Sequence, residues 1–588
     1  MNHRKSLIAL GAASAVFAGC VLPATPASAA PATFSVNFAV DEGPVQHAAS
    51  GFLHGISATS PEQYLVDGVN VTAIRGADYH PNLPSLYDPA TNARVEATGA
   101  DTMVGLYYYR SDPTNPLHTY WPGDGGDWQT WRDIVTNVYT ESVTRGYHVD
   151  SWIAWNEPNL QWNTSAHPYS RFLQTFDVAH DTLKAISPDI KIQGPEIYGF
   201  NFPLLTQFLD YCRANDCLPD MLTWHELSST PSNVEANTAR IKQWMVDSGI
   251  QPMPLAVTEY QGGGYGSPTP YNVGDNVAWL AQIERSTDNG LAYGLYSAWE
   301  WNGDDPNFRA TLGNATARSA DLPRGVWWNY NTYREMTGRR VGETSSAGVD
   351  GFGAVDASMK RATFLVGNQE ATSKEIDLSL VNLDSAPYLV RKGKIHLTVS
   401  KIPNTGTVTE PTQVIDADFR VKGGNVTLPL PSLPGQGAYR ISISQAVAEI
   451  KTVSYEAESL PAAASPAVPY RVIDDPRASG GAATVLDADS VGRSVRYSVA
   501  APTTGVYDVS ATLKKATAHG IVQLYVKGRA YGGPRDEFGT TEQYYRSGFG
   551  MIPLDRGPNV LEFRVVSRHP QSDSYKFVLD KLELKKVG

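Results

Sequence analysis

Residues 151–159 read Ser151-Trp152-Ile153-Ala154-Trp155-Asn156-Glu157-Pro158-Asn159, an apolar strand that runs into a carboxamide and a carboxylic acid. A second segment of the same design, Leu255-Ala256-Val257-Thr258-Glu259-Tyr260, ends in another acid. In (β/α)8 barrels the active site lies at the C-terminal ends of the strands. The two segments therefore predict a parallel strand each, with Glu157 and Glu259 at the functional end.

Both segments belong to a longer alternation of strand-like and helical segments between about 50 and 330. Apolar residues keep a helical period of 3.6 over 128–139 and over 172–183. No glycine-rich phosphate turn follows an early strand, which disfavours the main alternative, a doubly wound sheet. The pattern predicts an α/β fold, a (β/α)8 TIM barrel. Its strands are expected at 51–55, 70–76, 101–108, 149–155, 190–194, 221–225, 254–258 and 292–299.

Beyond about 330 the sequence changes to short strand-like runs separated by turn residues, with no long helical pattern. This is typical of all-β domains. We expect the barrel over 30–335, an adjoining β-sandwich over 336–447 and a C-terminal jelly-roll β-sandwich over 452–588. The strand-like 34–40 precedes the first barrel strand, so part of 30–48 is expected to add a strand to the first sandwich.

The N-terminus has the pattern of a signal peptide over 1–29. Arg4 and Lys5 precede an apolar run over 7–22, and Ala27-Ser28-Ala29 is a small-x-small cleavage site. We therefore expect a secreted, extracellular protein. Two alternatives remain open, a membrane anchor and a lipoprotein in which Cys20 carries the lipid.

The two other cysteines, Cys212 and Cys217, are separated by four residues. In an oxidising compartment such a pair can close a small loop, so a disulfide is expected, with two unlinked thiols as the alternative. Two cysteines without clustered histidines make an incomplete metal site.

Composition excludes several classes of partner. The chain has 588 residues, of which 42% are hydrophobic and 18% charged, a globular composition. Its net charge of −12, without a basic run, gives no electrostatic footprint for nucleic acid or for an anionic membrane.

All 13 tryptophans lie between Trp121 and Trp328. The C–H faces of sugars stack on such rings, so some of these tryptophans are expected in the cleft.

The two acids make a chemically specific pair. If the strand count holds, Glu157 and Glu259 end strands four and seven and face each other across the mouth of the barrel. Glycoside hydrolysis needs two opposed carboxyl groups, one protonated to assist the leaving oxygen and one ionised to attack the anomeric carbon. Glu196, Glu226 and Glu300, also near expected strand ends, are the alternatives for Glu259.

These motifs resemble clan A glycoside hydrolases, most closely the family 39 type. Phe52-Leu53-His54-Gly55 and Ser297-Ala298-Trp299-Glu300-Trp301 fit the same group. The resemblance implies a retaining double displacement with Glu157 as acid/base and Glu259 as nucleophile. It further implies a substrate-binding set in which Asn156 bonds the sugar 2-hydroxyl, Arg75 keeps Glu259 ionised, Trp299 forms a platform, and His225 and His54 lie at strand ends. Glu226 is expected to bond substrate hydroxyls or to pair with an arginine.

The last domain resembles carbohydrate-binding module families 6 and 35. Tyr455-Glu456-Ala457-Glu458 opens it, and a strand containing Asp580 closes it. The resemblance implies a structural calcium held by Glu456, Glu458 and Asp580, with exposed edge-strand acids as the alternative. The domain has no tryptophan, so Tyr531, Tyr544 and Tyr545 are the candidates for a sugar platform, and a purely structural module is the other interpretation.

The sequence thus predicts a secreted retaining glycosidase that acts on plant or microbial polysaccharide or its side chains, without a catalytic cofactor. Family resemblance favours β-xylosides or α-L-arabinofuranosides. A noncatalytic carbohydrate-binding protein and a transglycosylase with the same two glutamates are the alternatives. A metal-dependent hydrolase is disfavoured because the 12 histidines are scattered.

Overall fold

The computed structural model describes residues 31–77, 85–227, 231–260, 272–287, 292–296, 312–313, 322–404, 410–446 and 452–586. By its contacts, the chain from Ala32 onward groups into one unit. The expected signal peptide, with Cys20, lies outside the described residues. Within the described part of the chain, no helix is long and apolar enough to cross a membrane.

Eight parallel strands close the predicted barrel, each paired with the next in chain order and the last with the first. Each strand falls within or overlaps a segment that the sequence predicted. They are β2 (Gly51–Leu53), β3 (Ala73–Gly76), β4 (Asp101–Gly105), β5 (Ser151–Ile153), β6 (Ile192–Ile197), β7 (Met221–Glu226), β8 (Leu255–Tyr260) and β9 (Ala292–Tyr296).

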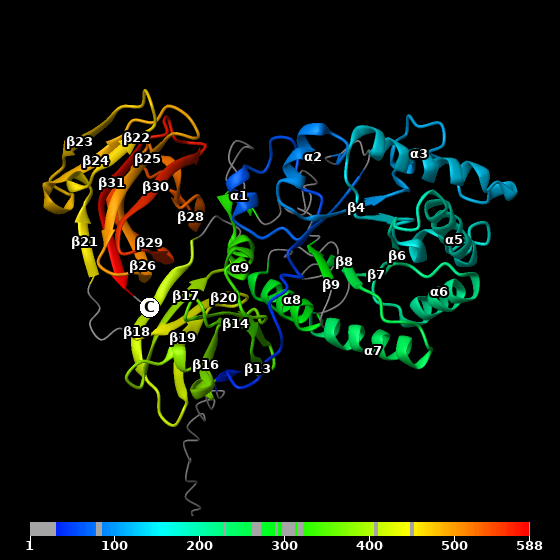
Figure 1. The fold of residues 1–588 in the computed structure, drawn as a ribbon, viewed down its shortest axis with the longest axis horizontal. Helices are drawn as coiled ribbons and strands as arrows, with labels where there is room; N and C mark the ends of the chain where they lie inside the picture. The colour runs from blue at the N-terminus through cyan, green and yellow to red at the C-terminus, as the bar shows by residue number, and fades with distance from the viewer. Residues whose placement is uncertain are drawn as a thin grey trace, which may run out of the picture. The chain divides into compact units, whose positions relative to one another are not determined.

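Helices surround this barrel, seen in blue to green in Figure 1. α3 and α5 bury the faces that the 3.6-residue period indicated, with Trp131, Ile134 and Val135 on α3 and Phe172 and Phe176 on α5. The helices are α1 (Gln63–Asp67), α2 (Pro89–Glu96), α3 (Gln129–Arg145), α4 (Pro158–Gln161), α5 (Tyr169–Ile186), α6 (Phe202–Asn215), α7 (Val234–Asp247), α8 (Val273–Arg285) and α9 (Gly325–Arg334).

The next domain is a sandwich of two sheets around its own apolar core. β1 (Ala32–Asn37) pairs with β13 and β16, so the chain's first described strand lies in this sandwich, where Figure 1 shows blue beside green. One sheet has the order β13 (Gly342–Ser345), β1, β16 (Lys374–Val381), β19 (Val426–Leu433). The other has the order β12 (Arg339–Arg340), β14 (Val349–Asp356), β15 (Arg361–Asn368), β20 (Ala438–Gln445), β17 (Lys394–Ile402), β18 (Thr412–Arg420).

The C-terminal domain is a second antiparallel sandwich, yellow to red in Figure 1. Its opening strand β21 (Thr452–Glu456) pairs with its closing strand β31 (Phe577–Lys586). One sheet has the order β23 (Tyr470–Asp474), β24 (Ala482–Leu486), β31, β26 (Gly505–Lys515), β29 (Gln543–Leu554). The other has the order β22 (Ala462–Ala464), β25 (Ser494–Ala501), β30 (Gly557–Arg568), β27 (Gly520–Val526), β28 (Arg529–Asp536).

The expected disulfide is not formed, because Cys212 and Cys217 are both free, buried thiols. The loop between them is closed by the backbone instead. Asp216 takes a left-handed conformation at the end of α6, and the Cys217 N–H donates to the Cys212 carbonyl at 2.9 Å. Burial and the neighbouring Cys217 thiol raise the pKa of Cys212, which favours its uncharged form.

Candidate active site

A cavity of about 400 Å³, lined by both polar and apolar surface, opens at the C-terminal ends of the barrel strands. This volume is within the range of small-molecule sites. Its lining combines charged groups from opposite strands with two stacked tyrosine rings, Tyr107 and Tyr108, whose centroids are 4.5 Å apart. The lining residues are Leu53, His54, Arg75, Tyr107, Tyr108, Arg110, Ser111, Asn156, Gln161 and Glu259.

Arg75, at the end of β3 and 1% exposed, links the groups of the site. Its Nη1 donates to Glu259 Oε1 at 2.8 Å, and its Nη2 donates to Asn156 Oδ1 at 2.5 Å and to Tyr107 Oη at 3.3 Å. Because Arg75 occupies the carbonyl oxygen of Asn156, the amide nitrogen of Asn156 is the group left for a sugar hydroxyl. The structure thus brings Arg75, Asn156 and Glu259 together as the sequence predicted.

Glu157 stands just past β5, where the backbone turns out of the barrel wall. Its φ of +47° lies in the left-handed region, and its N–H donates to the Glu196 carbonyl at 2.9 Å. Such a conformation is costly for a residue with a Cβ and is found where surrounding structure holds it, often at functional sites. The turn explains why β5 ends at Ile153, before the predicted end at 155.

His225, on β7 and fully buried, lies between carboxylates on both sides of its ring. Its Nδ1 is 3.0 Å from Glu157 Oε1, and its Nε2 is 3.1 Å from Glu196 Oε2 and 3.6 Å from Glu259 Oε1. Burial alone would lower the pKa of His225, but these negative charges raise it to about 9. An imidazolium has two N–H groups, which is what two flanking carboxylates require.

The two other buried carboxyls of the group have opposite pKa shifts. Burial raises the pKa of Glu259, against the opposing charges of His225 and Arg75. Burial would also raise the pKa of Glu196, but the Arg75 charge and hydrogen bonds from His225 and Thr258 hold it below its usual value. Glu196 is therefore the permanent counter-charge under the site.

The two predicted catalytic carboxyls lie close together. One oxygen of Glu157, one of Glu259 and one ring nitrogen of His225 all lie within 4.8 Å of one another. Retaining glycosidases separate their carboxyl groups by about 5–5.5 Å, and inverting ones by about 6.5–9.5 Å to admit a water. The same three groups could ligate a metal, but the Arg75 guanidinium at 2.8 Å from Glu259 makes the spot unfavourable for a cation.

The other predicted site residues have different outcomes. His54 lines the cavity, with its Nε2 3.4 Å from Tyr108 Oη. Glu226 is not brought into the group: it accepts from Trp224 Nε1 and from Asn237 on α7, on the side of β7 opposite His225. Trp299 and Glu300 lie outside the described residues. Among the described lining residues the aromatic rings are tyrosines, so the expected tryptophan platform is not seen there.

Sequence reasoning gave too little weight to Glu196 and missed Tyr107 and Thr258. Glu196 ranked only as an alternative nucleophile, although it ends strand β6 as Glu259 ends β8. Thr258 donates to Glu196 Oε2 at 2.7 Å from the position just before Glu259. Strict alternation would place Thr258 on the face opposite Glu259, but a register shift between the Val257 and Glu259 pairings lets both reach the site, which sequence alternation alone could not indicate.

The residues expected to hold calcium do not fit the ion in this arrangement. The Ser479 hydroxyl donates to Glu456 Oε2 at 2.5 Å and to Asp580 Oδ1 at 3.0 Å, so a serine occupies the place between the carboxylates. A calcium site needs six to eight converging oxygens. In the described residues, Glu456, Glu458 and Asp580 do not form a group with ligand atoms within 4.8 Å of one another. The structural calcium is therefore not supported.

Comparison with known proteins finds similarity to glycoside hydrolases. Residues 105–301, which contain Glu157, His225 and Glu259, match the model of Glycosyl hydrolases family 39. The chain is 22% identical to a 3-O-alpha-D-galactosyl-alpha-L-arabinofuranosidase of Bifidobacterium longum subsp. longum, over 90% of this chain and 52% of that protein. It is 22% identical to a 3-O-beta-L-arabinopyranosyl-alpha-L-arabinofuranosidase of Bifidobacterium pseudocatenulatum, over 83% of this chain and 55% of that protein.

The chain therefore spans about half the length of these two curated relatives. Among solved structures, N2152 from Neocallimastix frontalis is similar in fold, with a TM-score of 0.58 and 22% identity over 71% of this chain and all of that one. The family match over residues 105–301 and the two relatives, together with the closed barrel and its paired carboxyls, show that the chain is similar to glycoside hydrolases of the family 39 type.

Proposed function

We propose that this protein is a secreted, retaining α-L-arabinofuranosidase that acts on polysaccharide side chains through Glu157 and Glu259. The observation that carries the proposal is the approach of the two carboxyls, within 4.8 Å at the ends of opposed barrel strands. This spacing is closer to that of retaining than of inverting enzymes, which supports direct attack by one carboxylate.

In the first step Glu259 Oε attacks the anomeric carbon while Glu157 donates its proton to the glycosidic oxygen. The bond between that carbon and the oxygen breaks, the alcohol departs, and the sugar stays esterified to Glu259. Arg75 donates to Glu259 Oε1 at 2.8 Å and stabilises it as the carboxylate that the attack requires. His225 donates to Glu157 Oε1, so the transferable proton belongs on Oε2.

In the second step the Glu157 carboxylate removes a proton from water, and the water oxygen attacks the anomeric carbon. The ester bond breaks, Glu259 leaves as a carboxylate, and the sugar is released with its original configuration. The positive charge of His225 then lies beside the newly reprotonated Glu157, with Glu196 as its buried counter-charge. If a second sugar takes the place of water, the same residues give transglycosylation.

The substrate class rests on the two Bifidobacterium relatives, both of which are named as α-L-arabinofuranosidases with a 3-O sugar substituent. We extend this class to the present chain, with β-xylosides as the second candidate that the family resemblance suggests. The open cavity of about 400 Å³ has room for more than one sugar residue, in keeping with a substituted arabinofuranose.

The test is hydrolysis of 4-nitrophenyl α-L-arabinofuranoside, β-D-xyloside and a 3-O-substituted arabinofuranoside by wild type, Glu157→Ala and Glu259→Ala. We expect arabinofuranoside cleavage, lost by about 1000-fold or more in each variant. Azide should rescue Glu259→Ala with an inverted glycosyl azide and Glu157→Ala with a retained one. Equal cleavage by wild type and both variants would contradict the assignment. Binding without cleavage would favour a noncatalytic carbohydrate-binding protein.

Secretion is part of the proposal and rests on the N-terminal sequence. Expression of the full chain in a secreting host should release a protein that begins near Ala30, after the Ala27-Ser28-Ala29 site. N-terminal sequencing of the released protein checks this. If the protein stays with the cells, and a Cys20→Ala variant is released, the result would instead support the lipoprotein alternative.

A further inference from the structure

A second cavity, of about 370 Å³, lies against the outer face of the first sandwich and shares no lining residue with the cavity at the barrel mouth. Strands β15, β17 and β20 are neighbours in one sheet, and Ser442 pairs with Thr398 while Arg440 pairs with Ser400. Because side chains alternate along a strand, these four residues share one face of the sheet. Arg361 lies on the same face, an even number of residues from Leu365, which pairs with Arg440.

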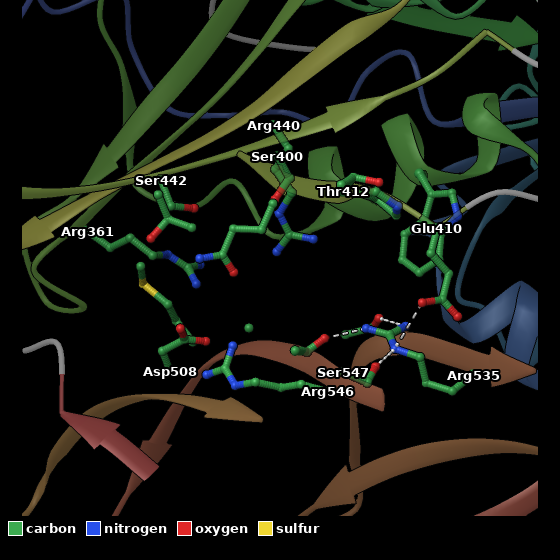
Figure 2. Close-up of a pocket in the computed structure, with 18 residues that line it drawn as sticks. Arg361, Ser400, Glu410, Thr412, Arg440, Ser442, Asp508, Arg535, Arg546 and Ser547 are labelled. Atoms are coloured by element: carbon green, nitrogen blue, oxygen red, sulfur yellow. Dashed lines mark hydrogen bonds and ion pairs between the residues drawn. The ribbon is translucent and has the colours of Figure 1, made fainter. Parts of the chain in front are cut away.

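The opposite wall comes from the C-terminal sandwich. Figure 2 shows Arg361, Arg440, Ser400 and Ser442 on one side and Asp508, Arg546, Ser547 and Arg535 on the other, with the cavity between them. Arg535 is held in this wall, because its guanidinium donates to Ser547 Oγ, to backbone carbonyls of its own strand β28 and to the Gly548 carbonyl of β29. The remaining three arginines turn toward the open space.

Two of these arginines bond the same residue, Glu335, one at its carboxylate and the other at its backbone carbonyl. The Arg440 guanidinium donates to Glu335 Oε2 at 2.6 Å, and Arg361, only 9% exposed, donates to the Glu335 backbone carbonyl at 2.8 Å. Burial and the nearby charges of Arg440 and Arg529 lower the pKa of Arg361, against the charge of Glu335. A buried guanidinium is costly unless an anion pairs with it. The cavity lining has four arginines against the two carboxyl groups of Glu410 and Asp508, so positive charge is in excess around it.

The hydroxyl groups beside these arginines are also unused. The side chains of Thr398, Ser400 and Ser442 make no hydrogen bond to any residue that the structure describes. A row of hydroxyls next to paired guanidiniums suits a ligand that has both a carboxylate and several hydroxyls. A small inorganic anion would use only the charge and would fill little of a 370 Å³ space.

We propose that this cavity binds a sugar residue that carries a carboxylate, a hexuronate. Arg361 and Arg440 take the carboxylate in the planar, forked geometry that guanidinium groups offer. Thr398, Ser400 and Ser442 bond the ring hydroxyls, and Arg546 closes the mouth from the C-terminal sandwich. This inference rests on the proposed function in one respect, namely that the protein encounters polysaccharide. The enzyme would thereby hold an acidic polysaccharide at a point outside the barrel mouth.

The test is isothermal titration calorimetry of the full chain with sodium D-glucuronate, D-glucose, sodium acetate and sodium sulfate. We expect glucuronate to bind with saturation and the other three to bind at least about tenfold more weakly. Acetate or sulfate binding as tightly as glucuronate would reduce the cavity to a simple anion site and overturn the proposal. No glucuronate binding, or glucose binding as tightly, would also overturn it.

Variants locate the binding. Arg440→Met should weaken glucuronate by about tenfold or more. Ser442→Leu, which fills the cavity and leaves the ion pairs intact, should do the same, so the result does not depend on the Arg440 variant folding. Arg546→Met, at a side chain 49% exposed and ion-paired to Glu583, should weaken binding, whereas its match Arg471→Met, 53% exposed and paired to Asp487, should not.

Equal affinities for Arg546→Met and Arg471→Met, with no effect of Ser442→Leu, would contradict the site. Glu259→Ala should bind glucuronate as wild type does, because the barrel site is elsewhere. Since the titration needs no turnover, it decides the inference even if no arabinofuranoside is cleaved. Loss of binding in Glu259→Ala alone would mean that the uronate had entered the barrel instead.

Discussion

Arg75 shows how one buried side chain can organise a reaction centre. It lies 2.8 Å from Glu259, 2.5 Å from Asn156 and 3.3 Å from Tyr107, and these partners come from three other strands or their ends. A planar guanidinium can reach all of them at once, whereas an ammonium is a compact charge that can satisfy one or two. Its geometry, as well as its charge, therefore matters for the site.

Arg75→Lys should accordingly lower kcat/KM for the arabinofuranoside by about 100-fold, although the charge is kept, because Asn156 and Glu259 lose their common anchor. Steady-state kinetics checks this, with Arg145→Lys, at a side chain that is 46% exposed and ion-paired to Glu141 outside the cavity, as the control. An Arg75→Lys variant whose kcat/KM stays within about threefold of wild type would show that charge alone suffices. A melting temperature for each variant separates loss of activity from loss of fold.

His225 predicts a dependence of stability on pH. Its folded-state pKa of about 9 lies above the value near 6.5 of an unfolded chain, so the folded protein binds the proton more tightly. The resulting stabilisation is fully present below pH 6.5 and is lost as the pH rises through 9. It amounts to about 3 kcal/mol. Urea unfolding should show that the free energy of unfolding of the wild type is lower at pH 9.5 than at pH 6.5.

In His225→Gln the free energy of unfolding should depend much less on pH, because this variant has no ionisable ring. Most of the loss of about 3 kcal/mol should be absent. His148→Gln removes a histidine that is 76% exposed and serves as the control. The same pH-dependent loss in wild type and in His225→Gln would show that the imidazolium does not hold the carboxylates together.

At the residue scale, the sequence could predict the groups that end strands but not those that support them. Glu157, Glu259, Asn156 and Arg75 each stand where an apolar strand stops, so alternation and position were enough. Glu226 also ends a strand, yet its side chain points outward to Trp224 and Asn237. Which face the last residue of a strand presents depends on where the strand enters the barrel, and one residue of uncertainty reverses it.

At the scale of elements, the close approach of α8 to the first sandwich depends on two facing glycines. A Cβ placed on Gly274 would lie 2.0 Å from the Asn368 carbonyl oxygen, and one on Gly367 would lie 2.4 Å from the Gly274 carbonyl. Neither contact can be relieved by moving a flexible side chain. The helix and strand β15 are thus held at backbone distance, which joins barrel and sandwich.

Gly274→Ala should therefore lower the free energy of unfolding by about 1–3 kcal/mol, although alanine is the better helix former. Urea unfolding with linear extrapolation measures it. Gly548→Ala, where a Cβ meets nothing within 4 Å, is the control and should change stability little. An unchanged or raised stability for Gly274→Ala would mean that α8 can move away without cost.

The elements themselves could be predicted well because barrel strands are short, apolar and separated by amphipathic helices. All eight were placed, and the strand at 34–40 was assigned to the sandwich that it joins. The disulfide prediction was wrong because spacing says only that two cysteines can meet. At the end of α6 a backbone hydrogen bond and buried thiols already close the turn.

At the scale of the whole molecule, the C-terminal sandwich shares an apolar cluster with the barrel. Ile521, Tyr525 and Val566 of that sandwich belong to the same buried cluster as Trp327 and Trp328 of α9. Gly533 approaches Trp328 so closely that a Cβ there would lie 2.3 Å from the ring, and Arg535 stands over the ring at 5.8 Å. No sequence pattern indicated this contact, because each partner looks like an ordinary core or turn residue within its own domain.

Domains joined by a buried apolar contact are expected to unfold together, and those without one to unfold separately. Trp328→Ala should cost about 3–5 kcal/mol by leaving a cavity between α9 and the β27–β28 sheet. In scanning calorimetry the C-terminal sandwich should then melt as its own transition, below that of the barrel. Because Trp328 also lines the second cavity, the same variant should weaken glucuronate binding.

Trp244→Ala is the matched control, since Trp244 on α7 packs against the barrel core on a helix that bears no part of this contact. It should lower the barrel transition and leave the two domains coupled, with glucuronate binding unchanged. If Trp328→Ala melts in one transition like wild type, the coupling must come from the polar contacts between the domains, such as Lys585 with Asp416 at 2.5 Å. The apolar cluster would then be a consequence of docking and not its cause.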